Sequence, residues 1–223
     1  MIDACKLCGT RRAKRACPGV DAGICATCCA TGREVTIDCP LDCPFLMEAR
    51  LHERPAPIAP QDIPNRDVEV SEEFVRDQEH LVLWFCHSLA RAMESRKAVD
   101  YDAREALDSS IKTLRATQSG LVYEARPENP YAADILDALT NATEELRKAI
   151  VDESGMASLR DVDLLGTLIF IQRLELQHNN GRRRGRAFYD FLLAHFPAKP
   201  APDVAQALAI GGDESAMDGA EAN

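Results

Sequence analysis

Between residues 67 and 197 the hydrophobic residues recur every three or four positions, as they do on one face of an α-helix. The clearest set is spaced four, three, four and three residues apart: Ile135, Leu139, Ala142, Leu146 and Ala149. The pattern predicts an all-α helical bundle of about five helices. Their expected ranges are 71–97, 101–125, 131–152, 159–179 and 184–196. The fourth is apolar nearly all round, so we expect it to be the central helix.

Two of these segments have well-marked core positions. In the segment 101–125 the expected core residues are Leu107, Ile111, Leu114 and Leu121, and two prolines within 126–130 end the helix. In the segment 184–196 they are Phe188, Phe191, Leu192 and Phe196.

The rest of the chain lacks this periodicity. Residues 1–53 contain few large apolar side chains, so a hydrophobic core alone cannot fold them. Residues 54–66 include four prolines and are predicted to be a semi-rigid linker. Residues 198–223 are small and acidic, which is typical of a disordered tail. We therefore expect four parts: a Cys-rich module at 1–53, a linker at 54–66, the bundle at 67–197 and the tail at 198–223.

Charge and hydropathy narrow the functional classes. The chain of 223 residues has a formal net charge of −10, which disfavours general binding to polyanions or anionic membranes. No apolar run is long enough to span a bilayer, and the first residues lack the basic and apolar regions of a signal peptide. We therefore expect a cytoplasmic protein without a membrane partner.

Cysteine is concentrated at the N-terminus, where eight of the nine fall within the first 43 residues. In the reducing cytosol such density favours metal ligation over disulfides. The eight divide into two zinc sites of four thiolates each. Site 1 is predicted to be Cys5, Cys8, Cys25 and Cys28, and site 2 to be Cys17, Cys29, Cys39 and Cys43. Cys29 is an alternative to Cys28 in the first site, and His52 is an alternative ligand.

A complete set of eight thiolates indicates structural zinc, whose binding would supply about 10 to 16 kcal/mol of folding energy. A catalytic zinc keeps an open coordination position, and nothing in the pattern supplies one, so we do not expect an enzyme. An iron–sulfur protein is the alternative, although the ferredoxin spacing of cysteines is absent.

The segments Cys5-Lys-Leu-Cys8, Cys17-Pro-Gly, Ile24-Cys25-Ala-Thr-Cys28-Cys29 and Cys39-Pro-Leu-Asp-Cys43-Pro together resemble a cross-brace zinc module of the MYND or HIT-finger kind. They resemble still more the Cys-rich N-termini of uncharacterised bacterial proteins. The sequence departs from MYND in its Cys-Cys doublet and in lacking the histidine near the end of that motif. The resemblance covers the first quarter of the chain and implies a small zinc-stabilised interaction module.

Two further sets of residues could have a chemical role or a purely structural one. Glu175 and His178 form a Glu-x-x-His motif of the kind found in di-iron bundles, with Asp77 and His80 as its only potential counterpart; solvated helix ends are the alternative. Cys86 lies in the most apolar segment and is expected to be a buried, inert thiol.

Two basic runs contrast with the acidic whole: Arg11, Arg12, Lys14 and Arg15 in the module, and Arg182, Arg183, Arg184 and Arg186 before the last helix. Either run is a candidate polyanion contact. The alternatives are solvated loops and, for the first run, compensation of the negative charge of zinc thiolates.

Together these features predict a non-enzymatic zinc protein that acts as an adaptor or regulator by binding another protein. The alternative is a nucleic-acid-associated factor using the two basic runs, and a more distant one is a di-iron or iron–sulfur redox protein.

Overall fold

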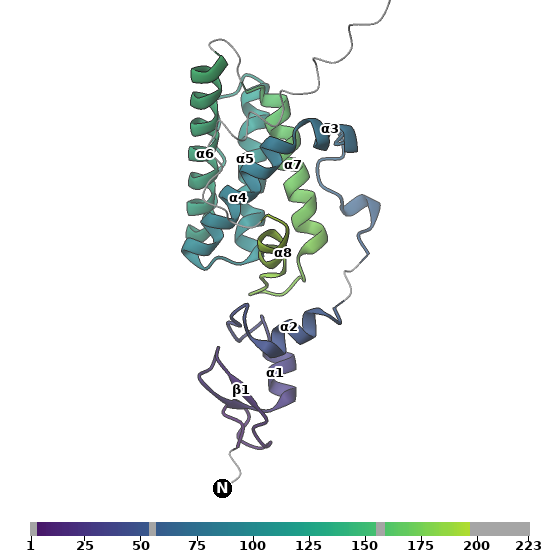
Figure 1. Ribbon diagram of the computed structural model, residues 1–223, viewed down its shortest axis with the longest axis vertical. Helices are drawn as coiled ribbons and strands as arrows, with labels where there is room; N and C mark the ends of the chain where they lie inside the picture. Colours follow the sequence, from purple (N-terminus) through teal and green to yellow (C-terminus); the bar gives the residue numbers. More distant parts are fainter. Residues whose placement is uncertain (1–3, 54–56, 155–158, 197–223) are drawn as a thin grey trace, which may run out of the picture.

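The computed structural model describes residues 4–53, 57–154 and 159–196. The predicted acidic tail lies outside the described residues. Figure 1 shows a small N-terminal part below a larger set of helices, with the chain segment before α8 facing the smaller part. We refer to residues 4–53 as the Cys module and to residues 71–196 as the bundle.

The Cys module contains a short hairpin and two short helices. Strands β1 (Arg15–Cys17) and β2 (Ala22–Ile24) pair antiparallel, with Arg15 opposite Ile24. Helices α1 (Ala26–Gly32) and α2 (Pro44–Arg50) follow. Its core has few apolar side chains: Ile24, Ile37 and Leu46 are buried among cysteines.

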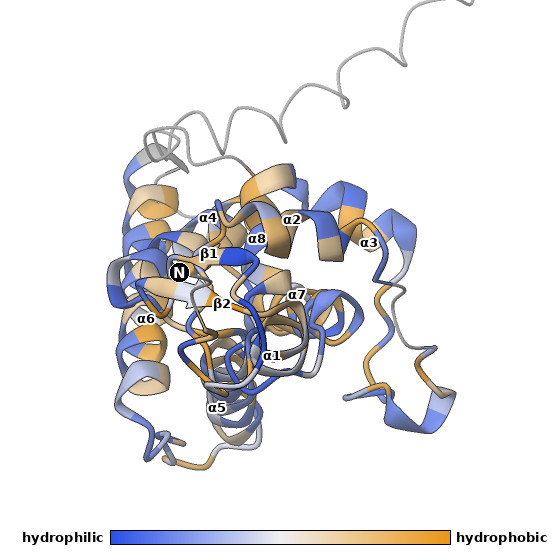
Figure 2. Cartoon of the chain, turned by 90° about the horizontal axis from the view of Figure 1, so that it is seen from below, coloured by the Kyte–Doolittle hydropathy of each residue, from blue (hydrophilic) through white to orange (hydrophobic). Residues whose placement is uncertain are grey.

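The bundle is mostly helical, as the periodicity predicted. Its elements are α3 (Glu72–Asp77), α4 (Glu79–Arg96), α5 (Asp100–Gln118), α6 (Pro130–Ser154), α7 (Asp161–His178) and α8 (Ala187–His195). Helix α5 packs against α6 and α7, and α4 packs against α6, α7 and α8. Figure 2 shows that several of these helices carry hydrophobic and hydrophilic residues on different sides, as amphipathic helices do.

The helix count is higher than the sequence predicted. The described residues contain eight α-helices rather than about five. Two of the additional helices lie in the Cys module. The third arises because the predicted helix 71–97 is divided at Gln78, whose φ of −105° and ψ of 22° are not helical. Phe74 of α3 packs against Gly166 of α7, where a β-carbon would lie 2.5 Å from the ring.

Helix α5 ends at Gln118, seven residues before the predicted end. Gly120 has a φ of +74°, and the next amide, Leu121 N, donates to Ala116 O at 2.9 Å. This is a Schellman termination, which uses the tolerance of glycine for left-handed backbone. Leu121 was therefore wrongly assigned to the core: it is 63% exposed.

The core lies between the long helices. Leu107, Ile135 and Ile169 are fully buried, and the last helix contributes Phe188 and Leu192. None of the helices in the described part of the chain combines the length and apolarity needed to cross a membrane.

The end of the predicted linker is attached to the bundle. The guanidinium of Arg173 donates to the carbonyls of Pro64, Asn65 and Val68 at 3.3, 2.8 and 3.0 Å. We refer to these three hydrogen bonds as the Arg173 clamp. Before it, the linker contains one turn of 3₁₀-helix, η1 (Pro60–Asp62). The chain therefore reaches the bundle at residue 64.

Candidate metal centre

Two turns of the Cys module supply four thiols. Cys5 and Cys8 lie in a turn closed by Gly9 N donating to Cys5 O at 2.7 Å. Cys25 is the N-cap of α1, and its sulfur accepts a hydrogen bond from Cys28 N at 3.4 Å. Lys6 N donates to Gly23 O at 3.0 Å, which holds the first turn against the hairpin that leads to the second.

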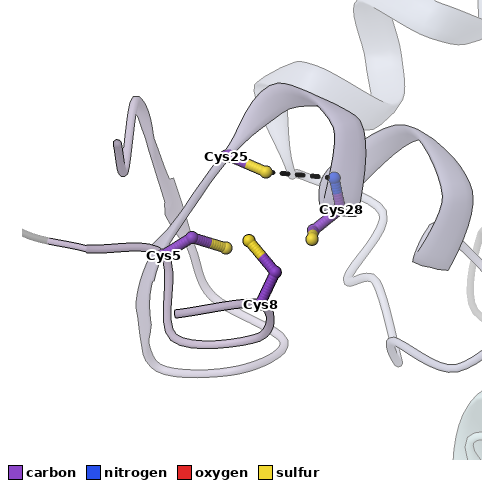
Figure 3. A group of neighbouring side chains, drawn as sticks. All are labelled: Cys5, Cys8, Cys25 and Cys28. Carbon is purple, nitrogen blue, oxygen red and sulfur yellow. Dashed lines mark hydrogen bonds between the residues drawn. The ribbon is translucent and has the colours of Figure 1, made fainter. Parts of the chain in front are cut away.

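The four sulfurs of Cys5, Cys8, Cys25 and Cys28 lie within 4.8 Å of one another. Figure 3 shows their side chains converging on a common centre. Cys5 and Cys25 are buried, and Cys8 and Cys28 are half-buried. Four converging thiols are a suitable ligand set for one tetrahedral ion. The fold thus brings together the four cysteines expected to share an ion, with Cys28 rather than Cys29 in the group.

The local environment favours the thiolate form at two of the four cysteines. Hydrogen bonds from Thr10 lower the pKa of Cys8 to about 5. The backbone N–H of Cys28 lowers the pKa of Cys25. The hydrogen bond to Cys25 raises the pKa of Cys28 to about 12. A bound cation would favour the thiolate form of each ligand.

The other four cysteines are arranged differently. Each is buried, and all belong to the same small core as the first group: Cys17, Cys29, Cys39 and Cys43. Within the described residues, however, no second group of three or more potential ligands lies within 4.8 Å. Arg15 donates to the sulfur of Cys29 at 3.2 Å, and burial raises the pKa of Cys39.

The first basic run is partly engaged with cysteine. The hydrogen bond with Cys25 raises the pKa of Arg11, and Arg15 contacts Cys29 while its guanidinium lies 4.6 Å from the ring centroid of Phe45. Arg12 and Lys14 are exposed. Two cations of this run, Arg11 and Arg15, therefore lie beside cysteine sulfurs, where they could compensate thiolate charge.

The second basic run fastens the Cys module to the bundle. Arg182 donates to Arg33 O at 3.0 Å and to the carboxylate of Glu53 at 2.8 Å. Arg186 forms an ion pair with Asp38 at 3.2 Å. Arg183 and Arg184 between them are exposed. The run is therefore divided between two interface residues and two solvent-facing cations.

Glu34 is the centre of this interface, and sequence reasoning missed it. Its side chain is 1% exposed and accepts hydrogen bonds from Arg50, Asn180 and the backbone N–H of Arg186 at 2.9, 2.8 and 3.2 Å. Its carbonyl accepts from Arg184 N at 2.8 Å. Arg50 also pairs with Asp190 of α8. No pattern in the sequence distinguishes Glu34 from a solvated glutamate.

The remaining candidate residues lie apart from the cysteines. Glu175 is buried and bound by Arg104 at 2.9 and 3.0 Å, whereas the ring of His178 stacks on Phe191 with centroids 3.6 Å apart. Asp77 and His52 are exposed, and His80 is half-buried. Cys86 is fully buried, which raises the pKa of its thiol to about 12.

No protein-family model, curated protein or solved structure matches this chain. The likeness to MYND and HIT fingers therefore rests on the spacing of the cysteines, and the fold and site stand on the geometry described above.

Proposed function

We propose that this protein is a non-enzymatic cytoplasmic adaptor, in which structural zinc maintains a protein-binding module beside a helical bundle. The convergence of four thiols at Cys5, Cys8, Cys25 and Cys28 carries the proposal. Four thiolates complete the tetrahedral coordination of zinc and leave no position for a substrate, as structural rather than catalytic sites do.

A second zinc ion completes the module in this proposal. Cys17, Cys29, Cys39 and Cys43 are all buried in a core that, in the described part of the module, has only three buried residues other than cysteine. Binding of an ion would draw these thiolates together and stabilise a core too small to fold on apolar burial. The resulting interleaved ligand order is that of a cross-brace finger of the MYND or HIT kind.

The surface of the Cys module supports a protein partner. Met47 of α2 and Leu51, the C-cap residue of that helix, are 56% and 84% exposed. Leu7, in the first cysteine turn, is 48% exposed. Contiguous exposed apolar residues mark protein-binding surfaces, and Met47 and Leu51 are four residues apart at the end of α2. The nucleic-acid alternative has fewer free cations, because Arg182 and Arg186 are engaged in the interface.

The ligand count is tested by elemental analysis of the purified full chain. We expect two zinc ions per chain. One zinc or fewer, or stoichiometric iron after anaerobic purification, would contradict the two-zinc proposal.

Partner binding is tested by capture with the tagged full chain from its native host, followed by identification and reconstitution with the purified partner. Met47→Asp/Leu51→Asp should abolish binding, whereas Val162→Asp, a change at a bundle residue that is 58% exposed, should retain it. Binding should persist at about 0.2 M salt and after nuclease treatment, because buried recognition contacts are weakly screened. Loss under either condition would favour the nucleic-acid alternative instead.

A further inference from the structure

A cavity of about 780 Å³ lies between the loop before α8 and the N-terminal end of α5. The end of α4 and the start of α6 complete its wall, through Lys97 and Tyr131. Gly185 shapes the loop, because a β-carbon there would lie 2.3 Å from Asn180 Oδ1. The volume is in the range of small-molecule sites.

The lining of this cavity is strongly basic for so acidic a protein. It contains seven lysine or arginine residues and three aspartates. Four of the seven cations form ion pairs: Arg96, Arg104, Arg182 and Arg186. The other three, Lys97, Arg183 and Arg184, are exposed and have no ion-pair partner within the described residues. These three are available to an anionic ligand.

The lining aspartates are already occupied by other donors. Asp100 accepts from the backbone N–H groups of Phe188 and Tyr189 at 3.0 and 3.1 Å. Asp102 accepts from Val99 N at 2.8 Å and from Asn129 at 2.6 Å. Asp38 pairs with Arg186. Each of the three carboxylates is therefore hydrogen-bonded or ion-paired to a group other than the three free cations.

Two aromatic rings share the wall with these cations. Tyr101 and Tyr131 are 54% and 51% exposed. Half-exposed aromatic rings beside arginine provide stacking surfaces for nucleobases, and unpaired guanidinium groups are suited to phosphate.

We propose that this cavity binds a nucleoside phosphate, with Lys97, Arg183 and Arg184 holding the phosphates and Tyr101 and Tyr131 contacting the base. A bare phosphate would not use the tyrosines, and a volume of about 780 Å³ suits a small molecule rather than a long nucleic acid. This inference does not rest on the adaptor role.

The test is calorimetry of the full zinc-loaded chain with ATP, with pyrophosphate and with a single-stranded oligouridylate. ATP should bind, and Arg183→Glu/Arg184→Glu should weaken its binding about 100-fold, since each lost charge-assisted contact is worth about tenfold. The control is Arg76→Glu/Arg91→Glu, which changes the net charge equally at exposed residues outside the cavity and should leave binding unchanged.

A second pair of variants tests the base contact. Tyr101→Ala/Tyr131→Ala should weaken ATP binding about tenfold and leave pyrophosphate binding unchanged, because stacking acts on the base alone. Tyr101→Phe/Tyr131→Phe should retain ATP binding. Absence of ATP binding at about 1 mM, or ATP binding that survives the Arg183→Glu/Arg184→Glu change, would overturn the proposal. Binding of oligouridylate without ATP would also overturn it, in favour of an open RNA surface.

Discussion

The two parts of this chain bury different kinds of side chain. The bundle buries 27 clustered residues in its described part, almost all of them hydrocarbon side chains. The Cys module buries nine, of which six are cysteines. Apolar burial stabilises the first through removal of surface from water, whereas the second has four converging thiols that could bind a metal ion. One chain thus contains two units that should respond to different treatments.

The two units can be followed separately. The only tryptophan of the chain, Trp84, is buried in the bundle and donates to Ala142 O at 3.0 Å. Its fluorescence therefore reports the bundle, and the zinc content or the thiolate absorbance of a Co²⁺-substituted sample reports the module.

Metal removal should have the largest effect. Chelation should unfold the Cys module, because it removes about 10 to 16 kcal/mol of apparent zinc binding energy. Trp84 fluorescence should stay native, since the bundle core contains no ligand of the predicted sites. Cys5→Ser should lower the zinc content by one ion.

The matched change in the other unit is Phe85→Ala at a fully buried bundle residue. It should lower the unfolding free energy of the bundle by about 3 to 5 kcal/mol and leave the zinc content unchanged. If chelation abolished the native Trp84 emission, the two units would share one cooperative transition.

The stability of the two units should also depend on pH in opposite directions. Burial raises the pKa of Asp100 to about 7, so between pH 4 and 7 the folded bundle holds a proton that the unfolded chain releases. The stability of the bundle should therefore fall as the pH rises through this window, by on the order of 4 kcal/mol. The module should show the opposite trend, because acid protonates its thiolates and releases zinc.

The variant Asp100→Asn should lack the part of this pH dependence that Asp100 causes. The measurement is the unfolding free energy at several pH values, from urea titrations followed by Trp84 fluorescence. Burial also raises the pKa of Glu175, so a smaller decrease of the unfolding free energy with pH should remain. Asp67→Asn is the control of opposite sign, since the hydrogen bond from Arg115 lowers the pKa of Asp67. An unchanged slope in Asp100→Asn would assign the effect to another group.

The smallest of these effects concerns the interface itself. Glu34→Gln should weaken the docking of the module by about 3 kcal/mol, because it leaves the buried Arg50 guanidinium with less compensating charge. Faster hydrogen exchange at Arg184 N should follow, since that amide donates to Glu34 O. Glu48→Gln, at an exposed residue of α2, should change neither. Equal exchange rates in both variants would show that Glu34 does not hold the units together.

The sequence predicted those features that follow from local periodicity and spacing. The faces of the long helices and the grouping of Cys5 and Cys8 with Cys25 and Cys28 are of this kind. The end of α5 was missed although Ser119-Gly120 is a helix-termination signal, because the apolar residues that follow seemed to continue the helix. Glu34 was missed because its burial depends on Arg50, Asn180 and Arg186, which are far from one another along the chain.

The clamp formed by Arg173 has a consequence for how the interface opens. Only ten residues, 54–63, separate the end of the Cys module from the first clamped carbonyl at Pro64. A semi-rigid, proline-containing linker of this length spans at most about 31 Å, so it keeps a detached module near its docking surface at an effective concentration on the order of millimolar. Detachment of the module would thus be a reversible, intramolecular equilibrium. A soluble molecule that competes for Glu34 would have to exceed millimolar concentration, or bind Glu34 more tightly than the segment before α8 does.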